Sequence, residues 1–424
     1  MTKPVVYWTS RALRVRDNPA LSYAQHLAFE KKVPLKVVFV VYPHFPYANE
    51  RNMHFLLSGL KEMQDKLKLL NIPLECILKD PVEYFQEHTQ HFEAIVMDHH
   101  VLKPVIATQK RVIEHAKTVN VKTYVLSVAP VVPVEVASPK LEFSARTIRP
   151  KIMGQYKAWL QEAEPVIAHS FNKENLELPD IDVDAIINAH PHWKQLKRSV
   201  LKPGEDAAYK QLEHFINKGL QHYGDRNEID SQGQSNLSAY LHFGMISPKV
   251  MISKIESTQS PHAPLFVEEA LVRRELAENY CHYQKNYDSL DGAWPWAKTT
   301  LLEHVHDPRL FEYNLETFEQ AKTHDALWNH CMQTMIETGY LHSYLRMYWA
   351  KMVLYWTKHP EDAIKILIHL NDTYFLDGRD PNGYTGIMWS VAGVHDRPWF
   401  NRPITGLIRA MGLEGTLKKT KIRL

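Results

Sequence analysis

Cysteine and long apolar runs are scarce in this chain of 424 residues. The three cysteines, Cys76, Cys281 and Cys331, form no CxxC pair, which argues against a disulfide scaffold and a cysteine-rich zinc site. No run approaches the ~18 apolar residues that a membrane helix needs. Charges between Lys3 and Asp17 are not those of a secretory signal. We therefore expect a soluble protein of a reducing cytoplasm.

Several motifs of common enzyme classes are also absent. The sequence contains no GxGxxG, no GxxxxGK[ST], no GxSxG and no HExxH. Their absence argues against four classes of protein: those with the dinucleotide-binding fingerprint, P-loop nucleotide hydrolases, hydrolases with a nucleophile elbow, and zinc proteases with the usual metal-binding helix. We expect no metal site.

Net charge is small but unevenly distributed. Fifty Lys and Arg against 48 Asp and Glu leave +2, which excludes a uniformly basic coat. Residues 331–424 nevertheless hold 12 basic and 8 acidic side chains, and seven of the ten tryptophans lie at or beyond Trp294. Basic charge among aromatic rings suits a surface that contacts phosphates and stacks bases. Core tryptophans with solvated charges explain the same composition, and composition alone leaves both interpretations open.

The N-terminal part alternates short apolar runs with amphipathic segments. Strands are predicted at Val5–Trp8, Leu35–Val41, Leu74–Leu78, 94–97 and 121–126. The run LKVVFVV at Leu35–Val41 is apolar on both faces, as in a buried parallel strand. Five such strands separated by helices predict a doubly wound α/β domain with a parallel sheet over residues 1–127.

The remainder is different in character. Residues 128–205 contain VAPVVP and PDIDVD without a sustained period, which predicts a long connector. Residues 206–424 are almost entirely helical in pattern, including a long helical stretch at 324–358, and predict an all-α second domain.

One helical segment, YLHSYLRMYWAKMVLYW at 340–356, is strongly aromatic around Arg346. A buried arginine needs a carboxylate partner, and Asp377 and Asp380 in LDGRDPNGYTGIMW are the nearest candidates. Such an ion pair either has a purely structural role or holds the Arg346 cation beside an anionic cofactor. Trp349 and Trp356 lie two turns apart on one helix face. They are core residues or, with Trp328, part of a redox path.

Five blocks of sequence together resemble the photolyase/cryptochrome family, and within it the class II cyclobutane pyrimidine dimer photolyases. They are QSNLSAYLHFGMIS (234–247), ALVRRELAENYCHY (270–283), KTHDALWN (322–329), LHSYLRMYWAK (341–351) and NDTYFLDGRDPNGYTGIMWSVAGVHDRPW (371–399). The resemblance covers nearly the whole chain and implies an antenna-type N-terminal domain followed by a helical domain that binds FAD and DNA.

The resemblance also implies which residues hold FAD, whose working form is reduced and anionic. Arg346 and Asp377 match the ion pair beside the isoalloxazine, and Asn371 matches the class II residue that faces the flavin N5. The other implied FAD contacts are Tyr223, Ser235, Asn236, Leu237, Ser238 and Arg274, with Asp380 beside them. Trp349, Trp328 and Trp356 match the electron-transfer chain, in that order outward from the flavin.

The implied substrate is DNA that contains a flipped-out pyrimidine dimer. Glu269 matches the acid that hydrogen-bonds a pyrimidine carbonyl, and together with Arg346, Asn371 and Asp377 it forms the expected catalytic set. Met347, Trp389 and Trp399 match the walls of the lesion pocket. Arg226 and Asn227 match the residues that fill the gap in the duplex. Arg273 stands where some relatives have tryptophan, and Arg397 and Arg402 are our own candidates for phosphate contacts, with solvated charges as the alternative.

The expected activity is light-driven repair of cyclobutane pyrimidine dimers, in which photoexcited reduced FAD gives one electron to the dimer and regains it. The alternatives are a cryptochrome-like photoreceptor and, less favoured, repair of the (6–4) lesion. The short tail TLKKTKIRL argues against the photoreceptor. We expect a monomer with access to the nucleoid or nucleus, no membrane and no obligate protein partner. The antenna chromophore, a deazaflavin, a folate or none, stays open.

Overall fold

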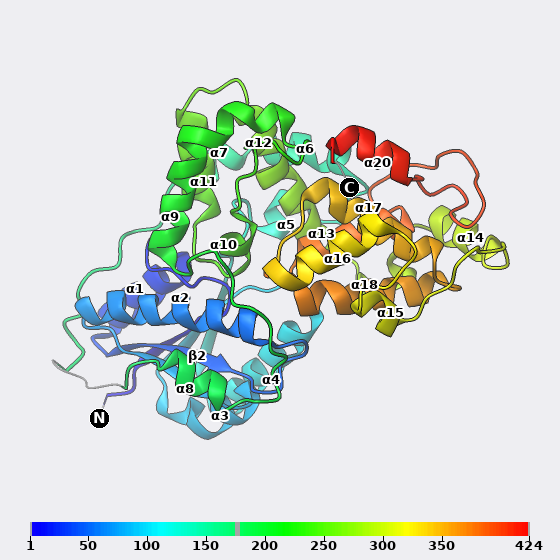
Figure 1. Cartoon of the computed structure of the whole chain (residues 1–424). Helices are drawn as coiled ribbons and strands as arrows, with labels where there is room; N and C mark the ends of the chain where they lie inside the picture. Colours follow the sequence, from blue (N-terminus) through cyan, green and yellow to red (C-terminus); the bar gives the residue numbers. More distant parts are fainter. Residues whose placement is uncertain (1, 174–178, 423–424) are drawn as a thin grey trace. The chain divides into compact units, whose positions relative to one another are not determined.

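The computed structural model describes residues 2–173 and 179–422 (Figure 1). The chain divides into two compact units. The sheet unit comprises residues 1–133, 156–213 and 236–257, and the helical unit comprises 134–155, 214–235 and 258–424. The expectation of a connector over residues 128–205 stays a prediction, although the structure assigns these residues to one or other compact unit.

The sheet unit is built on the parallel sheet that the sequence predicts. Its five strands lie in the order β3-β2-β1-β4-β5. Their bounds are Val5–Trp8 (β1), Leu35–Val41 (β2), Leu74–Leu78 (β3), Ala94–Asp98 (β4) and Lys122–Leu126 (β5). The helices between them are α1 (Pro19–Lys31), α2 (Glu50–Leu69), α3 (Pro81–His88) and α4 (Lys103–Thr118). This arrangement confirms the doubly wound α/β fold.

The sheet core forms because alternate strand residues face α3 and α4. Trp8 packs on Phe85 of α3 with ring centroids 4.5 Å apart, and Val6 and Met97 join the same buried cluster. At the carboxyl ends of β1 and β4, the buried Asp98 accepts hydrogen bonds of 2.7 Å from the backbone N–H groups of Ser10 and Arg11. The strand order reverses between these two strands, which makes this the switch point of the sheet. The Asp98 carboxylate therefore fixes the loop after β1 at the switch point.

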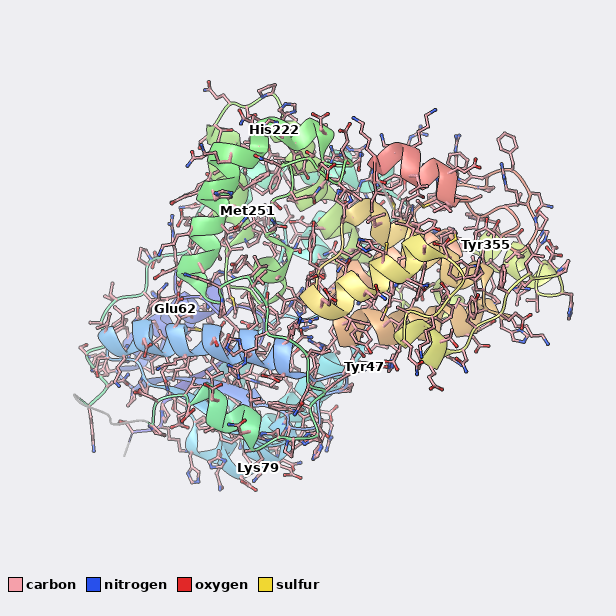
Figure 2. All side chains as sticks on the ribbon, viewed as in Figure 1. Tyr47, Glu62, Lys79, His222, Met251 and Tyr355 are labelled. Atoms are coloured by element: carbon pink, nitrogen blue, oxygen red, sulfur yellow. The ribbon has the colours of Figure 1, made fainter. Side chains whose placement is uncertain are left out.

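Further short helices complete the sheet unit. They are α7 (Tyr156–Trp159), α8 (Val183–Asn188), α9 (Glu205–His214), α10 (Ser238–His242) and α11 (Pro248–Ser257). Glu62 on α2, labelled in Figure 2, accepts the Asp206 N–H of α9 at 2.9 Å. Arg14 donates to the carbonyl oxygens of Gly244 and Val128, each at 3.0 Å. Such contacts, far apart in sequence, explain why these segments belong to the sheet unit.

The regular elements of the helical unit are α-helices together with short π- and 3₁₀-helices. Its first elements are α5 (Val134–Ala137), α6 (Ala145–Met153), η2 (Phe215–Gly219), η3 (Leu220–Asp225), α12 (Ala263–Val267), η4 (Glu268–Arg273), α13 (Arg274–Tyr283) and η5 (Leu290–Gly292). The later ones are α14 (Pro295–Glu303), α15 (Leu315–Glu319), α16 (Ala326–Thr338), α17 (Ser343–Tyr355), α18 (Pro360–Tyr374), α19 (Pro381–Ala392) and α20 (Leu413–Thr420).

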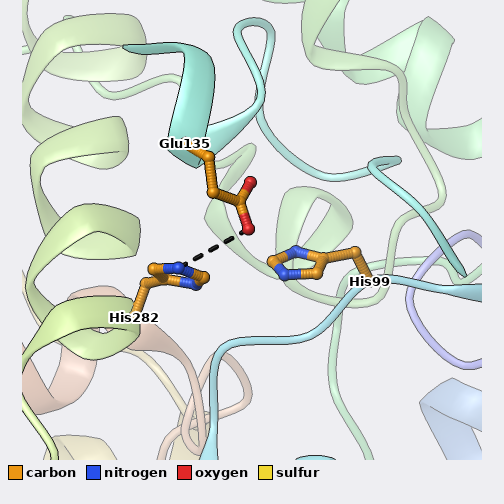
Figure 3. A group of neighbouring side chains, drawn as sticks. All are labelled: His99, Glu135 and His282. Atoms are coloured by element: carbon orange, nitrogen blue, oxygen red, sulfur yellow. Dashed lines mark ion pairs between the residues drawn. The ribbon is translucent and has the colours of Figure 1, made fainter. Parts of the chain in front are cut away.

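The aromatic helix α17 is central to this unit, since it packs against α16, α18, α19 and α20. An ion pair links two of the other elements: Glu135 of α5 points at His282 of α13, with 3.5 Å between Oε1 and Nε2 (Figure 3). His99, drawn in the same figure, belongs to the sheet unit. Among the described residues, no helix is both long and apolar enough to span a membrane.

The helical stretch expected at 324–358 is in fact two helices. α16 ends where Gly339 adopts φ 74°, and its N–H bonds the carbonyl of Met335. His342 then caps α17, since its Nδ1 accepts from the Tyr344 N–H at 3.3 Å. Glycine is the residue that adopts this left-handed cap most readily, and the break sets the direction of α17 independently of α16.

Candidate active site

Arg346 and Asp377 form an ion pair, as the sequence predicts. Arg346 lies on α17 and Asp377 in the loop before α19, and the guanidinium also stacks over the Phe375 ring at 3.6 Å from its centroid. The Arg346 Nε is buried and has no hydrogen-bond partner among the described residues. A buried donor of this kind favours an acceptor beside it, so the pair retains capacity for a polar ligand.

Asn371 of α18 is buried next to the same loop. Its Nδ2 donates to Asp372 Oδ1 at 2.8 Å. A Cβ at Gly383 would lie 2.8 Å from this Nδ2, so only glycine lets the first turn of α19 pack so closely. The fold therefore holds the Asn371 amide tightly between α18 and α19.

Asp372 is a functional candidate that the sequence reasoning missed. It is buried, and it accepts the Arg379 N–H and the Tyr384 hydroxyl, both at 2.8 Å. Burial, followed by the Asp372 charge, raises the pKa of Tyr384 well above its usual range. Asp372 thus fixes the loop that carries Asp377, and the nearest signal in the sequence was its position beside Asn371.

Asp380 has a local structural role. It is the N-cap of α19 and accepts from the Asn382 N–H at 2.9 Å. Of the two carboxylates that the sequence offered to Arg346, Asp377 is therefore the partner, because Asp380 faces the start of its own helix.

The other residues expected at FAD fall in different parts of the chain. Tyr223 is buried in η3, and Arg274 is buried at the start of α13. Ser235 belongs to the helical unit, whereas Asn236, Leu237 and Ser238 belong to the sheet unit. Asn236 adopts φ 55° and Ser238 is the first residue of α10. Their roles at a cofactor stay predictions.

The three tryptophans of the expected electron path are all buried and in contact. Trp328 Nε1 donates to the Trp349 carbonyl at 2.9 Å, and the rings of Trp328 and Trp356 lie 6.0 Å apart. Trp356, 6% exposed, also contacts the ring of Tyr313 at 5.8 Å and that of His324 at 4.9 Å. The sequence reasoning missed Tyr313 and His324, because only the fold brings their rings to Trp356.

Glu269 and Arg273 lie on the π-helical turn η4. Glu269 Oε1 is 3.2 Å from Arg226 Nη2, and the Arg226 guanidinium stacks over Tyr223 at 4.8 Å. Arg273 contacts Glu268 at 3.1 Å. Asn227 follows Arg226 in a half-exposed loop. Arg226 therefore forms an ion pair with Glu269, whereas Arg273 forms one with Glu268.

The residues expected around a flipped lesion are only partly gathered. Met347 and Trp389 line a cavity of about 190 Å³ with Lys351, Asp396 and Arg409. Trp399 is 36% exposed and lies under the guanidinium groups of Arg397 and Arg409, at 5.4 and 5.1 Å. Arg402 is exposed and pairs with Gly406 through the backbone. The cavity therefore takes its cations from Lys351 and Arg409, whereas Arg397 and Arg402 are not among its lining residues.

Comparisons with solved structures define the class of fold. A cryptochrome from Synechocystis sp. PCC6803 superposes with a TM-score of 0.73 at 14% identity, over 95% of this chain and 84% of that chain. An archaeal photolyase from Sulfolobus tokodaii, described with two FAD molecules, gives 0.74 at 15% identity, over 98% and 87%. The fold is that of photolyases and cryptochromes.

Comparisons of sequence are closer. Residues 5–173 match the family model described as DNA photolyase. The deoxyribodipyrimidine photo-lyase of Potorous tridactylus is 41% identical over 98% of this chain and 79% of that protein. The protein of the same name from Arabidopsis thaliana is 38% identical over 99% and 87%. That of Methanothermobacter thermautotrophicus is 37% identical over 99% and 92%. The chain belongs to the DNA photolyase family.

Proposed function

We propose that this protein is a deoxyribodipyrimidine photo-lyase, which repairs cyclobutane pyrimidine dimers in DNA when illuminated. The relatives that bear this name match nearly the full chain. The single structural observation that carries the proposal is the Arg346–Asp377 pair with its buried Nε, which has no partner among the described residues, because it offers a fixed cation and a free donor inside the helical unit. Asn371, Trp349, Met347 and Trp389 provide the further groups that such a reaction needs.

The residues of the helical unit fit FAD, as the family and the Sulfolobus tokodaii protein with FAD suggest. Arg346, Asp377, Asn371 and Arg274 would hold it from this unit. Bound in its reduced anionic form and excited by light, FAD would supply one electron to the dimer and take it back afterwards, so the net redox change would be zero. The Arg346 guanidinium stabilises negative charge beside it, and the Asn371 amide is able to donate or accept a hydrogen bond.

The tryptophans would connect the buried interior with the surface. Trp349 is buried beside Phe375, with ring centroids 5.9 Å apart, and Phe375 in turn lies under Arg346. From Trp349 the contacts continue to Trp328 and then to Trp356. We propose that these rings conduct an electron inward from an external thiol reductant, which is oxidised as the reduced state is restored.

The surface of the helical unit would bind the lesion. A pyrimidine dimer is poorly stacked, so flipping it out of the duplex costs less than flipping an ordinary base. Met347 and Trp389 would contact its apolar faces, and Glu269 would hydrogen-bond a pyrimidine carbonyl. Arg226 and Asn227 would occupy the gap left in the duplex. These assignments, the class II subgroup and a monomeric state are part of the proposal.

The direct test is repair by purified, chemically reduced protein of an oligonucleotide with a single thymine dimer. We expect the dimer to disappear under near-UV or blue light and to persist in the dark. Equal amounts of dimer after light and dark incubation would contradict the proposed activity. Flavin binding without repair would instead favour a photoreceptor of the same fold.

A further inference from the structure

A cavity of about 190 Å³ in the helical unit brings together two cations, aromatic walls and an open stretch of backbone. Tyr344, Met347 and Lys351 of α17 form one side, and Trp389 and Ser390 of α19 form another. The segment from Asp396 to Thr416, which leads into α20, supplies the rest. We call this space the α20 cavity.

Lys351 is a cation with few partners inside this cavity. It is 2% exposed, and its ammonium group donates to the Ser390 carbonyl. Burial lowers the pKa of Lys351 to about 7, while the Asp396 charge raises it and Arg409 lowers it further. A buried ammonium with three donors needs more acceptors than one carbonyl. An anion in the cavity would supply them.

The nearby acid, Asp396, is already engaged by its own loop. Its Oδ1 accepts from the Arg397 N–H at 2.8 Å and from Trp399 Nε1 at 3.2 Å. Arg409, in contrast, is an exposed cation that lines the cavity and touches the Trp399 ring. The lining of the cavity carries two cations, Lys351 and Arg409, against the one carboxylate of Asp396, which leaves it a net positive charge.

The part of the cavity that leads into α20 includes two glycines, Gly412 and Gly415, whose backbone is not covered by a side chain of their own. A Cβ at Gly412 or at Gly415 would meet no described atom within 4 Å, so both glycines border open space. Gly412 is also the N-cap of α20, and no side chain of the described residues caps that helix. The first N–H groups of a helix attract anions, and glycine lets a ligand approach the backbone closely. Together with Lys351 and Arg409, this stretch of backbone suits a phosphate.

We propose that the α20 cavity binds one backbone phosphate of the damaged DNA strand, with Lys351 and Arg409 as its cationic contacts. This inference rests on the proposed function. DNA is the favoured source of the phosphate because Met347 and Trp389 line the same cavity and are the expected walls for the flipped dimer. The phosphates of a flipped dinucleotide are covalently attached to it, so one of them must lie close to those walls.

The experiment places an uncharged methylphosphonate at each phosphate around the dimer in turn and measures DNA binding in the dark. Wild-type protein should lose about tenfold in affinity at one position, as expected for a charged phosphate contact. In Lys351→Met, the same substitution should cost clearly less than in the wild type, because one of the two cationic contacts is already gone. Lys365→Met, at an exposed lysine on α18, should behave like the wild type.

Arg409→Met changes an exposed side chain and serves as the second variant if Lys351→Met does not fold. It should show the same loss of sensitivity at the same phosphate. Equal sensitivity of wild type and both variants at every position would overturn the inference. Competition by inorganic phosphate that depends on Lys351, without coupling to any DNA phosphate, would overturn it too, since the cavity would then take a free anion. Failure of the proposed function is seen separately, as absence of light-driven repair in wild type and Lys365→Met.

Discussion

Arg226 and Glu269 lie in contact, with 3.2 Å between Nη2 and Oε1. The family resemblance assigns them to different parts of damaged DNA, Arg226 to the gap in the duplex and Glu269 to the flipped pyrimidine. Each group therefore neutralises the other until DNA separates them. A substrate with a flipped base would therefore break this pair: Arg226 would move to the gap in the duplex, and Glu269 would contact the flipped pyrimidine.

Glu269→Gln tests this relationship. The variant should bind dimer-containing DNA about threefold more tightly, because a negative charge beside the phosphates is removed and Arg226 is released. The yield of repair per absorbed photon should fall, because Glu269 can hydrogen-bond the pyrimidine carbonyl only as a protonated carboxylic acid, and the amide N–H of glutamine is a weaker donor to the electron-rich carbonyl of the reduced dimer. Filter binding in the dark and repair under calibrated light measure the two effects. Weaker binding together with an unchanged yield would show that Glu269 does not face the pyrimidine.

Trp356→Phe tests the tryptophan path. Photoreduction of oxidised FAD should slow at least tenfold, because phenylalanine is much harder to oxidise than tryptophan, while chemically reduced protein should repair at nearly the wild-type rate. Absorption spectra under steady illumination follow the reduction. Trp294→Phe, at a tryptophan outside the path, is the control and should photoreduce normally. Loss of repair in pre-reduced Trp356→Phe would place this residue elsewhere in the mechanism.

Asp377→Asn tests the ion pair at the expected cofactor. The substitution leaves the half-buried Arg346 without its carboxylate, which should disturb the loop after α18 and loosen FAD. We expect the flavin-to-protein ratio after purification to fall severalfold, as read from the visible absorption spectrum. Asp362→Asn, at an exposed acid on α18, should retain normal flavin. Full flavin content in Asp377→Asn would contradict the assignment.

Lys351 makes DNA binding depend on pH if the α20 cavity holds a phosphate. Its pKa lies near 7 because of burial, with Asp396 and Arg409 as the charged groups that act on it. A bound phosphate favours the ammonium form, so binding takes up a proton above pH 7 and the Kd rises there, by at most tenfold per pH unit. Below pH 6 this dependence should vanish, since Lys351 is already charged. Binding isotherms from pH 6 to 9 measure the slope, which Lys351→Met should abolish.

The sequence predicts the sheet unit well because its strands are short, buried runs between strongly periodic helices. Leu35–Val41 is an example, since its pattern alone identifies a central strand. The position of the segment 128–205 in the fold is harder to predict from sequence, because contacts with residues far away in sequence determine which unit each part of it joins. The Ile181 N–H, for instance, donates to Gln64 Oε1 at 3.0 Å, and no local pattern records that contact.

Some residues of the candidate site are likewise predictable from the sequence, and others are not. Arg346 and Asp377 were identifiable because a cation within an aromatic helix requires an acid, and the family blocks cover both positions. Lys351 and Asp372 were not singled out, although they are close to these residues in sequence. Their importance arises from burial by α19, α20 and the loop after α18, which the residues on either side do not reveal.

Single-flash spectroscopy of reduced protein mixed with dimer-containing DNA tests the proposed electron cycle most directly. We predict that each productive flash splits a dimer and that the flavin spectrum afterwards returns to its starting form, because the electron is returned. Dimers that survive the flash, or repair accompanied by an equal amount of lasting flavin oxidation, would contradict it.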